Sequence, residues 1–477
     1  MSKSLSGLLL AAACALQAGC ASYSGIAPEF KTLELAAVHG NSSVKTYENW
    51  PKEDWYDELH DPLLTRLIEQ ALADSPNVQA ATAKLNRARA VSGLAESALW
   101  PQVGASLATT RERFSEHGQT PPPYAGTTRS INDVQLSGQW ELDFFGKNRA
   151  TLNAALGEIR ASEAEYQATR VLLANNVARS YYALARLLAQ RALAEQRSRQ
   201  RADLASLVER RVKAGLDTRV ELEAAQGVLP ENARDIAMLD EQIGLARHSL
   251  AALIGQGPGA AEAIAPTLPA VPALTLPASI PADLLGHRAD VVAARWRVES
   301  SVHGMESTRA LFYPNINLRG FAGFSAIGFD QWLDIGSRQP GLGLSITLPL
   351  FDSDRLRNQY RSSAAQVDAA VATYNSTLLE ALHDVADQLS TLAALQVQLA
   401  RQQAALASAE RSYELALKRY QADISDRMSV LNVETNVIAQ RRIAVDLQAR
   451  WIDGHLRLIR ALGGGFEETT SPALASH

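Results

Sequence analysis

The two halves of this chain repeat each other at a spacing of about 208 residues. Residues 211–217 correspond to 419–425, and 253–255 correspond to 461–463. Each half has the same order: a short helix, an aromatic residue before proline, two segments of alternating polarity, a very long helix, a turn and a second helix. Such self-similarity indicates one structural unit built twice.

Two segments lack proline for about 70 residues each, from Phe145 to about Ala214 and from Phe351 to about Ala422. At about 1.5 Å per residue, each would form a helix roughly 100 Å long, which suits a structure that crosses a wide compartment. Apolar residues recur at steps of three and four, as in a seam between paired helices. The seam residues are Leu173, Val177, Tyr181, Leu184, Leu188, Leu378, Leu382, Val385, Leu389, Leu392 and Leu399.

Each long helix is followed by a turn and a return helix, over about 219–254 and 427–462. Gly215 in the first turn suits the left-handed conformation that ends many helices. Pro230 lies within the first return helix and is expected to kink or interrupt it. Six prolines between residues 255 and 281 predict an extended linker between the repeats.

Four shorter segments alternate in polarity, with apolar stripes at 103–107, 134–142, 316–321 and 341–348. Each is close to the ten residues that a tilted transmembrane strand needs. Four strands leave two unpaired edges and are too few to close a barrel, so membrane strands would require several chains. Three copies would supply twelve strands. The alternative is a small soluble sheet with one wet face.

The segments between these strands have the composition of surface loops. Residues 110–130 carry three consecutive prolines, and residues 325–340 are rich in glycine and polar side chains. Such stretches run over a protein surface and connect its regular elements.

The first twenty residues have the features of a secretory signal. Lys3 precedes an apolar stretch that ends in small residues before Cys20, and the stretch is too short for a stable membrane span. Residues 16–20 resemble a bacterial lipoprotein signal, which implies that Cys20 is acylated after cleavage and anchors the chain. The other interpretation is an ordinary signal with a chance cysteine.

Composition excludes several other classes of protein. Lysine and arginine total 46 against 51 aspartates and glutamates, a net charge of −5 without the basic face of a nucleic-acid-binding protein. The two cysteines lie within the first twenty residues, and the nine histidines are scattered singly. Residues 463–465 lack the lysine of a phosphate loop and are interpreted as a helix stop. We therefore expect no enzyme activity, no cofactor and no metal site.

Several motifs, in this order, resemble one known family. They are Asp-Pro-Leu-Leu at 61–64, Leu-Ile-Glu-Gln-Ala-Leu at 67–72, Ser-Pro-Asn-Val at 75–78 and the segment 280–291. Together with the duplication, they resemble the TolC-like outer-membrane efflux proteins, in the lipoprotein branch called NodT or OprM type. The resemblance covers nearly all of residues 50–463.

The resemblance implies a mostly α fold with a small β part. Duplicated helical hairpins would form a trimeric α-helical tunnel, joined to a 12-stranded β-barrel with four strands per chain. The homotrimer would sit in the outer membrane, lipid-anchored, with its helical part projecting into the periplasm. It would passively conduct drugs, toxic compounds or metals, delivered by a periplasmic adaptor and an inner-membrane pump of the RND type.

The expected domain boundaries follow from the repeat and the resemblance. They are a signal peptide at 1–19, an anchor segment at 20–60, the first repeat at 61–254, a Pro-rich linker at 255–281, the second repeat at 282–463 and a disordered tail at 464–477.

The resemblance also implies a gate at the inner end of the tunnel, closed by acidic residues near the helix turns. In the second turn we expect Asp423 and Asp426 to form rings of charge through threefold symmetry. Arg419 or Arg427 would tie neighbouring subunits together, and Tyr420 belongs to the same turn. Asp423 stands where the family usually has glycine. Solvated turn charges without a gating role are the alternative.

Two other functions remain open at this point. The same fold could serve as a type I protein-secretion duct. A lipid-anchored coiled-coil scaffold without a pore is the other possibility, although a scaffold has no need of four strands of membrane length.

Overall fold

The computed structural model describes residues 22–33, 50–271, 284–349 and 351–468. They divide into two compact units. The first unit gathers the described residues of Met1–Leu33, Lys84–Glu163 and Ala293–Asn375, and the second those of Glu34–Ala83, Ala164–Val292 and Ser376–His477. Each unit therefore draws segments from both repeats. Cys20 lies outside the described residues.

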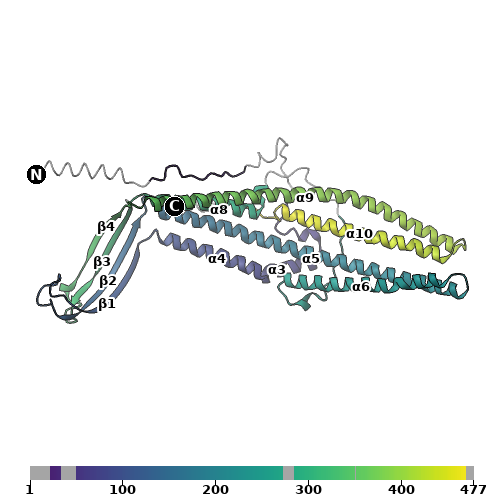
Figure 1. Cartoon of the computed structure of the whole chain (residues 1–477), viewed down its shortest axis with the longest axis horizontal. Coiled ribbons are helices and arrows are strands. Elements are labelled where there is room, and N and C mark those ends of the chain that lie inside the picture. Colours follow the sequence, from purple (N-terminus) through teal and green to yellow (C-terminus); the bar gives the residue numbers. More distant parts are fainter. Residues whose placement is uncertain (1–21, 34–49, 272–283, 350, 469–477) are drawn as a thin grey trace. The chain divides into compact units, whose positions relative to one another are not determined.

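The first unit contains one antiparallel sheet with the strand order β1-β2-β3-β4 (Figure 1). The four predicted strand segments are confirmed. Three strands are longer than expected and take in residues 110–113, 128–130 and 325–327, which we had assigned to loops. The strands are β1 (Gln102–Arg113), β2 (Thr128–Leu142), β3 (Asn315–Ile327) and β4 (Gly341–Thr347).

All four strands meet helices at the same end of the sheet. Helices α4 (Pro76–Ser97) and α8 (Ala289–Ala310) precede β1 and β3, whereas α5 (Lys147–Lys213) and α9 (Ser353–Gln421) follow β2 and β4. The opposite end carries the two connections, one of which includes the short helix η3 (Ile335–Ser337). We refer to these as the helix end and the loop end of the sheet.

A cluster of mostly aromatic side chains packs together at the helix end of the sheet in the first unit. Phe312, Leu356 and Tyr360 are buried together, and Tyr23 from the N-terminal segment packs against them. The ring centroids of Tyr23 and Phe312 lie 5.6 Å apart in an edge-to-face arrangement, a favourable geometry for aromatic pairs. The segment 22–33 is thereby fixed to the start of α9.

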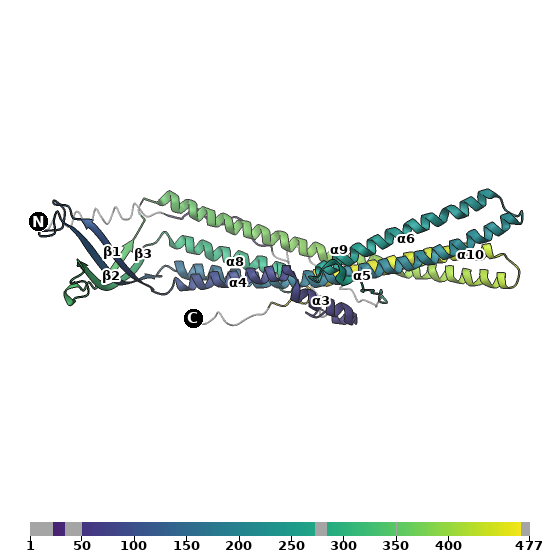
Figure 2. The ribbon, with the colours of Figure 1, turned by 90° about the horizontal axis from the view of Figure 1, so that it is seen from below.

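The second unit is helical. It contains the remaining parts of α5 and α9 and their return helices α6 (Arg219–Leu253) and α10 (Arg427–Ala461), each joined by a short turn (Figure 2). We expected Pro230 to kink or interrupt α6; the helix continues through this proline, so it is not interrupted. Its shorter elements are η1 (Asp57–Leu59), α3 (Pro62–Asp74), η2 (Pro258–Ala261) and α7 (Leu284–His287).

Most of the predicted helix seams are buried. Leu188, Leu389 and Leu399 are only partly buried, while Leu187 and Leu395 are buried instead. An α-helix has 3.6 residues per turn, so its buried stripe drifts away from a strict seven-residue repeat. Among the described residues, no helix combines the length and apolar character needed to cross a membrane. The remaining seam residues, all buried, are Leu173, Val177, Tyr181, Leu184, Leu378, Leu382, Val385 and Leu392.

A series of polar contacts fixes the packing of α5 against α10. The Asn175 side chain donates to a carbonyl of α10 at 2.5 Å, and Arg179 pairs with Asp453 at 2.6 Å. Further along, Gln200 donates to the hydroxyl of Thr435 at 2.8 Å. As residue numbers rise on α5 they fall on α10, so the two helices run antiparallel in one register along this contact.

An ion cluster around the buried Arg288 joins the segment before α8 to α9 and α10. The Arg288 guanidinium contacts the Asp290 carboxylate at 2.6 Å and the Asp384 carboxylate at 3.3 Å, and Arg460 contacts Asp384 at 3.4 Å. Burial opposes ionisation, but the Arg288 guanidinium outweighs it and lowers the pKa of Asp290. The sequence motif at 280–291 thus includes Arg288, whose ion pairs connect this segment to α9.

Three consecutive glycines after α10 approach other parts of the second unit closely. All three have a positive φ. A Cβ built on Gly463 would lie 1.8 Å from the His287 carbonyl oxygen, and one on Gly464 would lie 2.3 Å from a methyl of Val171. We had placed the start of a disordered tail at residue 464, but Gly464 is packed. These glycines allow the residues after α10 to pack closely against other parts of the second unit.

We expect Gly464→Ala to destabilise the helical unit by more than about 3 kcal/mol, because a left-handed backbone cost and an overlap with Val171 add together. Gly215→Ala is the matched control. Gly215 also has a positive φ but nothing within 4 Å of its Cβ position, so its loss should be only about 1–2 kcal/mol. Thermal unfolding followed by circular dichroism measures both, and equal losses would contradict this account.

Candidate functional site: the amphipathic sheet and the helix turns

The register of the sheet places its apolar side chains on one face. Directly paired residues point to the same side, and successive residues alternate. One row, for example, consists of Val103, Gly138, Gly320 and Leu342. We call this the apolar face; its larger members are Val103, Leu107, Val134, Leu136, Trp140, Leu142, Ile316, Leu318, Phe324, Leu342, Leu344 and Ile346.

The apolar face is open to solvent in a single chain. Leu342 is 80% exposed, Leu107 67% and Leu136 55%. From the row of Trp140 to the row of Asn132, the paired residues on this face include no charged side chain. A connected exposed apolar surface of this kind marks contact with a membrane or another protein.

The opposite face of the sheet is polar. Its residues include Asp133, Glu141 and Arg319 together with serines, glutamines and asparagines. Its large apolar residues are Ile131, Ile327 and Phe321, and the Phe321 ring covers Gly341 so closely that a Cβ there would lie 2.4 Å from a ring carbon. The strands therefore separate an apolar side from a water-compatible side.

Aromatic side chains gather where the strands meet the helices. Trp100 is 66% exposed and Phe144 70%, and the Phe145 and Tyr313 rings stack with centroids 4.9 Å apart. Trp140 lies on the apolar face and donates its indole N–H to a backbone carbonyl at 2.9 Å. Such aromatic residues favour the boundary between membrane and water.

The turns after the two long helices have the same backbone geometry. Their central residues have a positive φ, 72° at Gly215 and 57° at Asp423, a conformation that glycine adopts freely and aspartate tolerates. The expected left-handed Gly215 is confirmed. The matching bonds are Gly215 N–H to Val212 O and Leu216 N–H to Arg211 O in the first turn, and Asp423 N–H to Tyr420 O and Ile424 N–H to Arg419 O in the second.

Asp426 caps the return helix α10. Its carboxylate accepts the backbone N–H of Ser429 at 2.9 Å and the Ser429 hydroxyl at 2.6 Å. The Ser429 hydrogen bonds, with a smaller contribution from the Arg211 charge, lower the pKa of Asp426. Asp426 is therefore ionised at neutral pH. Asp423 is exposed and has no side-chain partner among the described residues.

The two turns differ in their ion pairs. In the first turn, the Arg211 guanidinium binds Asp217 with two hydrogen bonds of 2.7 and 3.1 Å. The equivalent residues of the second turn are Arg419 and Ser425. Because serine replaces the acid, Arg419 is left exposed without an acidic partner in the described part of the chain.

Arg427 has a partner within its own chain. Its guanidinium lies 3.6 Å from the Asp203 carboxylate of α5, and both side chains are at least half exposed. The first hairpin is therefore linked to the second beside the turn. Asp203 and Arg211 were not among the predicted site residues, although the correspondence of Arg211 with Arg419 in the repeat was available as a signal.

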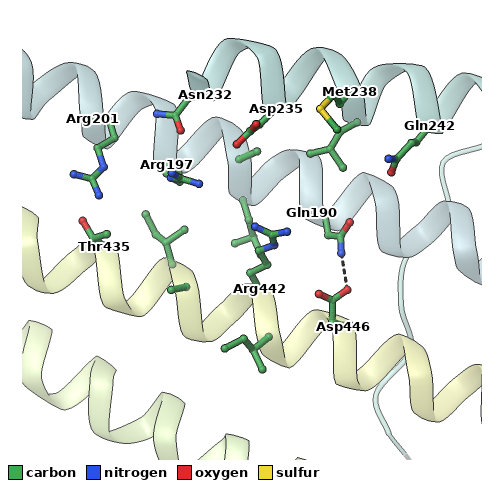
Figure 3. A pocket seen from close by; sticks show the side chains of 16 residues that line it. Gln190, Arg197, Arg201, Asn232, Asp235, Met238, Gln242, Thr435, Arg442 and Asp446 are labelled. Atoms are coloured by element: carbon green, nitrogen blue, oxygen red, sulfur yellow. Dashed lines mark hydrogen bonds between the residues drawn. The ribbon is translucent and has the colours of Figure 1, made fainter. Parts of the chain in front are cut away.

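A groove of about 690 Å³ lies between α5, α6 and α10 of the second unit (Figure 3). Arg197 and Arg201 of α5 and Arg442 of α10 line it. Asn232 of α6 is 3% exposed, and its side-chain nitrogen has no hydrogen-bond partner among the described residues. The Nε atom of Arg201 is likewise buried without one. The lining also includes Asp235 and Asp446, so the groove combines three arginines with two aspartates.

Within the described residues, no group of three or more histidines, cysteines, aspartates and glutamates has the arrangement of a metal site. The described part of the chain thus offers two surfaces with functional character. One is the open amphipathic sheet, and the other is the region of the turns and the charged groove.

Comparison with known proteins identifies the family. The model for "Outer membrane efflux protein" matches residues 67–256 and 280–464. The chain belongs to this family. It is the outer-membrane channel component of a tripartite efflux system, with its helical part on the periplasmic side. The expected resemblance, fold class, efflux function and outer-membrane location are confirmed.

Relatives of known name agree with this assignment. The chain is similar to the fusaric acid resistance protein FusA of Burkholderia cepacia, with 34% identity over 74% of this chain and 68% of that protein. It is 31% identical to the putative multidrug resistance outer membrane protein MdtQ of Shigella flexneri, over 88% of this chain and 89% of that one. The crystal structure of the outer membrane protein VceC of Vibrio cholerae matches with a TM-score of 0.80 and 36% identity, covering 88% of this chain and all of that one.

The two faces of the sheet should respond differently to a charge. Leu136 lies near the middle of the apolar face, and Gln135 lies beside it on the polar face. We expect Leu136→Arg to cost about 2–4 kcal/mol in lipid, as a charge does near the middle of a membrane. Gln135→Arg should cost much less. Urea unfolding of protein reconstituted in lipid vesicles measures both, and equal costs would show that the apolar face does not contact lipid.

Proposed function

We propose that three copies of this chain form an outer-membrane efflux duct. The supporting observation is the open sheet, whose outer strands β1 and β4 have unpaired edges beside an exposed apolar face. Lipid does not tolerate unpaired edges, and pairing β4 of one chain with β1 of the next would remove them. Three chains give twelve strands with the polar face toward a water-filled lumen, above a tunnel formed by twelve helices.

The N-terminal segment supports lipid attachment at Cys20. In the first unit, Asp368 of α9 accepts the backbone N–H groups of Glu29 and Phe30, both at 2.8 Å. Arg357, in the second turn of α9, donates to the Ser22 carbonyl. Only one residue separates Ser22 from Cys20, so an acyl group on Cys20 would enter the membrane close to the helix end of the sheet.

The second turn supports a gate at the periplasmic end. Asp423 has no side-chain partner among the described residues, and Asp426 is ionised. In a trimer, these carboxylates would form negative rings that attract cations. Arg419, which lacks the acid that holds Arg211 in the first turn, is the residue best placed to reach a neighbouring subunit. Arg427 would instead hold the two hairpins of one chain together.

We expect the double variant Asp423→Asn, Asp426→Asn to lower the preference of the channel for cations and to change its conductance. Asparagine tolerates positive φ and still caps a helix, so the turn is preserved while its charge is removed. Glu241→Gln on α6 is the control. Single-channel recordings in planar bilayers give the result, and an unchanged conductance and ion selectivity in the double variant would remove the gate assignment.

We further propose that the charged groove contacts the periplasmic adaptor. Three arginines line it beside two aspartates, Asp235 and Asp446. An acidic side chain of a partner would pair with an arginine of the groove through charge-assisted hydrogen bonds. The adaptor would in turn bind an inner-membrane pump of the RND type, which would supply the energy.

Reversing the groove charge should uncouple the pump from the duct. We expect Arg201→Glu, Arg442→Glu to weaken adaptor binding roughly tenfold or more, because like charges then face each other. Conductance of the isolated channel should stay at its wild-type level. Arg411→Glu, on the exposed side of α9, is the control. Adaptor affinity measured by surface plasmon resonance tests this; equal binding by both variants would exclude the groove.

Small toxic compounds are the favoured cargo. The relatives are named for resistance to fusaric acid and to multiple drugs, and a duct of this kind leaves substrate selection to its pump. A deletion strain tested against drugs, organic acids and metals measures the cargo class, and loss of protein secretion alone would favour a type I secretion duct.

We keep the two repeats at 61–254 and 282–463 as the proposed domain division.

A further inference from the structure

The apolar face ends in two arginines at the loop end of β1. Arg111 and Arg113 are two residues apart, so both point to the same side as Leu107. Their partners across β2 are Ser130 and Thr128, which carry no charge. Counted from the helix end, they are the first charged side chains that the paired residues place on this face.

The position of these arginines matches one boundary of a membrane. Along β2, Ser130, the partner of Arg111, lies ten residues from Trp140 at the aromatic end. Ten residues extend about 34 Å along a strand, or roughly 26 Å along the membrane normal at a tilt of about 40°. The lipid-facing band of such proteins is about 25 Å tall. Because the helical part is periplasmic, the arginines lie at the outer leaflet.

Their positive charge is poorly compensated by the protein. Arg113 contacts Glu116 at 3.2 Å, but these side chains are 68% and 64% exposed, and such surface pairs are weak. Arg111 is exposed and has no acidic partner among the described residues. Its neighbour Glu112 points to the opposite face, where it lies across from Arg129 in the strand register.

The neighbouring subunit would not supply the missing anion from its strand. In the proposed trimer, β1 pairs with β4 of the next chain, and β4 consists of Gly-Leu-Gly-Leu-Ser-Ile-Thr without an acidic residue. A guanidinium beside hydrocarbon favours an anionic hydrogen-bond partner. The paired strands offer no such partner to Arg111, so an anion that binds it would come from outside the sheet.

We propose that Arg111 and Arg113 bind the phosphate groups of lipids in the outer leaflet of the outer membrane. This rests on the proposed function, because it requires the apolar face to lie against lipid. A guanidinium binds phosphate with two parallel hydrogen bonds, and basic side chains beside a membrane span recognise phosphorylated head groups. The aromatic end and the arginine end would then fix the height of the protein in the membrane.

The test measures lipid bound to the trimer after extraction from outer membranes in a mild detergent. We expect Arg111→Gln, Arg113→Gln to retain at least about threefold less phosphorylated lipid than the wild type, by mass spectrometry and phosphorus assay. The double lysine variant should retain an intermediate amount, since it keeps charge without the bidentate geometry. Arg319→Gln, on the polar face of the same sheet, should retain the wild-type amount.

A second measurement uses the wild-type protein and therefore does not depend on folding of a variant. Lipid A added to delipidated trimer should raise its melting temperature, and lipid A stripped of its phosphates should not. Equal lipid retention by the wild type and the glutamine variant, or an equal effect of both lipid probes, would overturn the proposal. If the wild-type protein conducts ions in bilayers, either of these two outcomes would refute the lipid-binding inference alone. Absence of conductance would instead refute the proposed efflux duct.

Discussion

The rest of the structure depends on a sheet that one chain leaves unfinished. Its four strands expose an apolar face, which is unfavourable in water, and two rows of unpaired backbone groups, which are unfavourable in lipid. The strand order explains how a duplicated chain arrives at this state. Strands β1 and β2 come from the first repeat and β3 and β4 from the second, so the duplication doubles the sheet without closing it. Closure must come from other copies.

The helices meet a different constraint, because long apolar seams specify their register weakly. Leucine and alanine recur along α5 and α9, and neighbouring helices could slide by one turn at little cost. The contacts from Asn175, Arg179 and Gln200 to α10 remove this freedom, since each polar group finds its partner in only one alignment. Partly buried polar groups of this kind specify an arrangement even where they add little stability.

The sequence predicted the elements well and their tertiary links poorly. Helix bounds came within a few residues, because proline, glycine and periodicity are local signals. Three of the strands extended past their expected ends, because β pairing continues into segments with loop-like composition once a partner strand is present. Neither the ion pair of Arg427 with Asp203 nor the groove beside Asn232 could be predicted, since both join segments far apart in the chain. The fit of Gly464 against Val171 was missed for the same reason.

The two hairpin turns show how a repeat can keep its backbone and change its function. Both turns close with the same hydrogen bonds and both use a left-handed residue. The first is neutralised internally, because Asp217 holds Arg211. The second replaces that aspartate with Ser425 and the left-handed glycine with Asp423, so an arginine and a carboxylate are both released. A turn with unpaired charges of both signs can bind the same turn of a neighbouring subunit and separate from it. A turn whose charges are paired internally cannot. This difference supports our proposal that the gate lies in the turn of the second repeat.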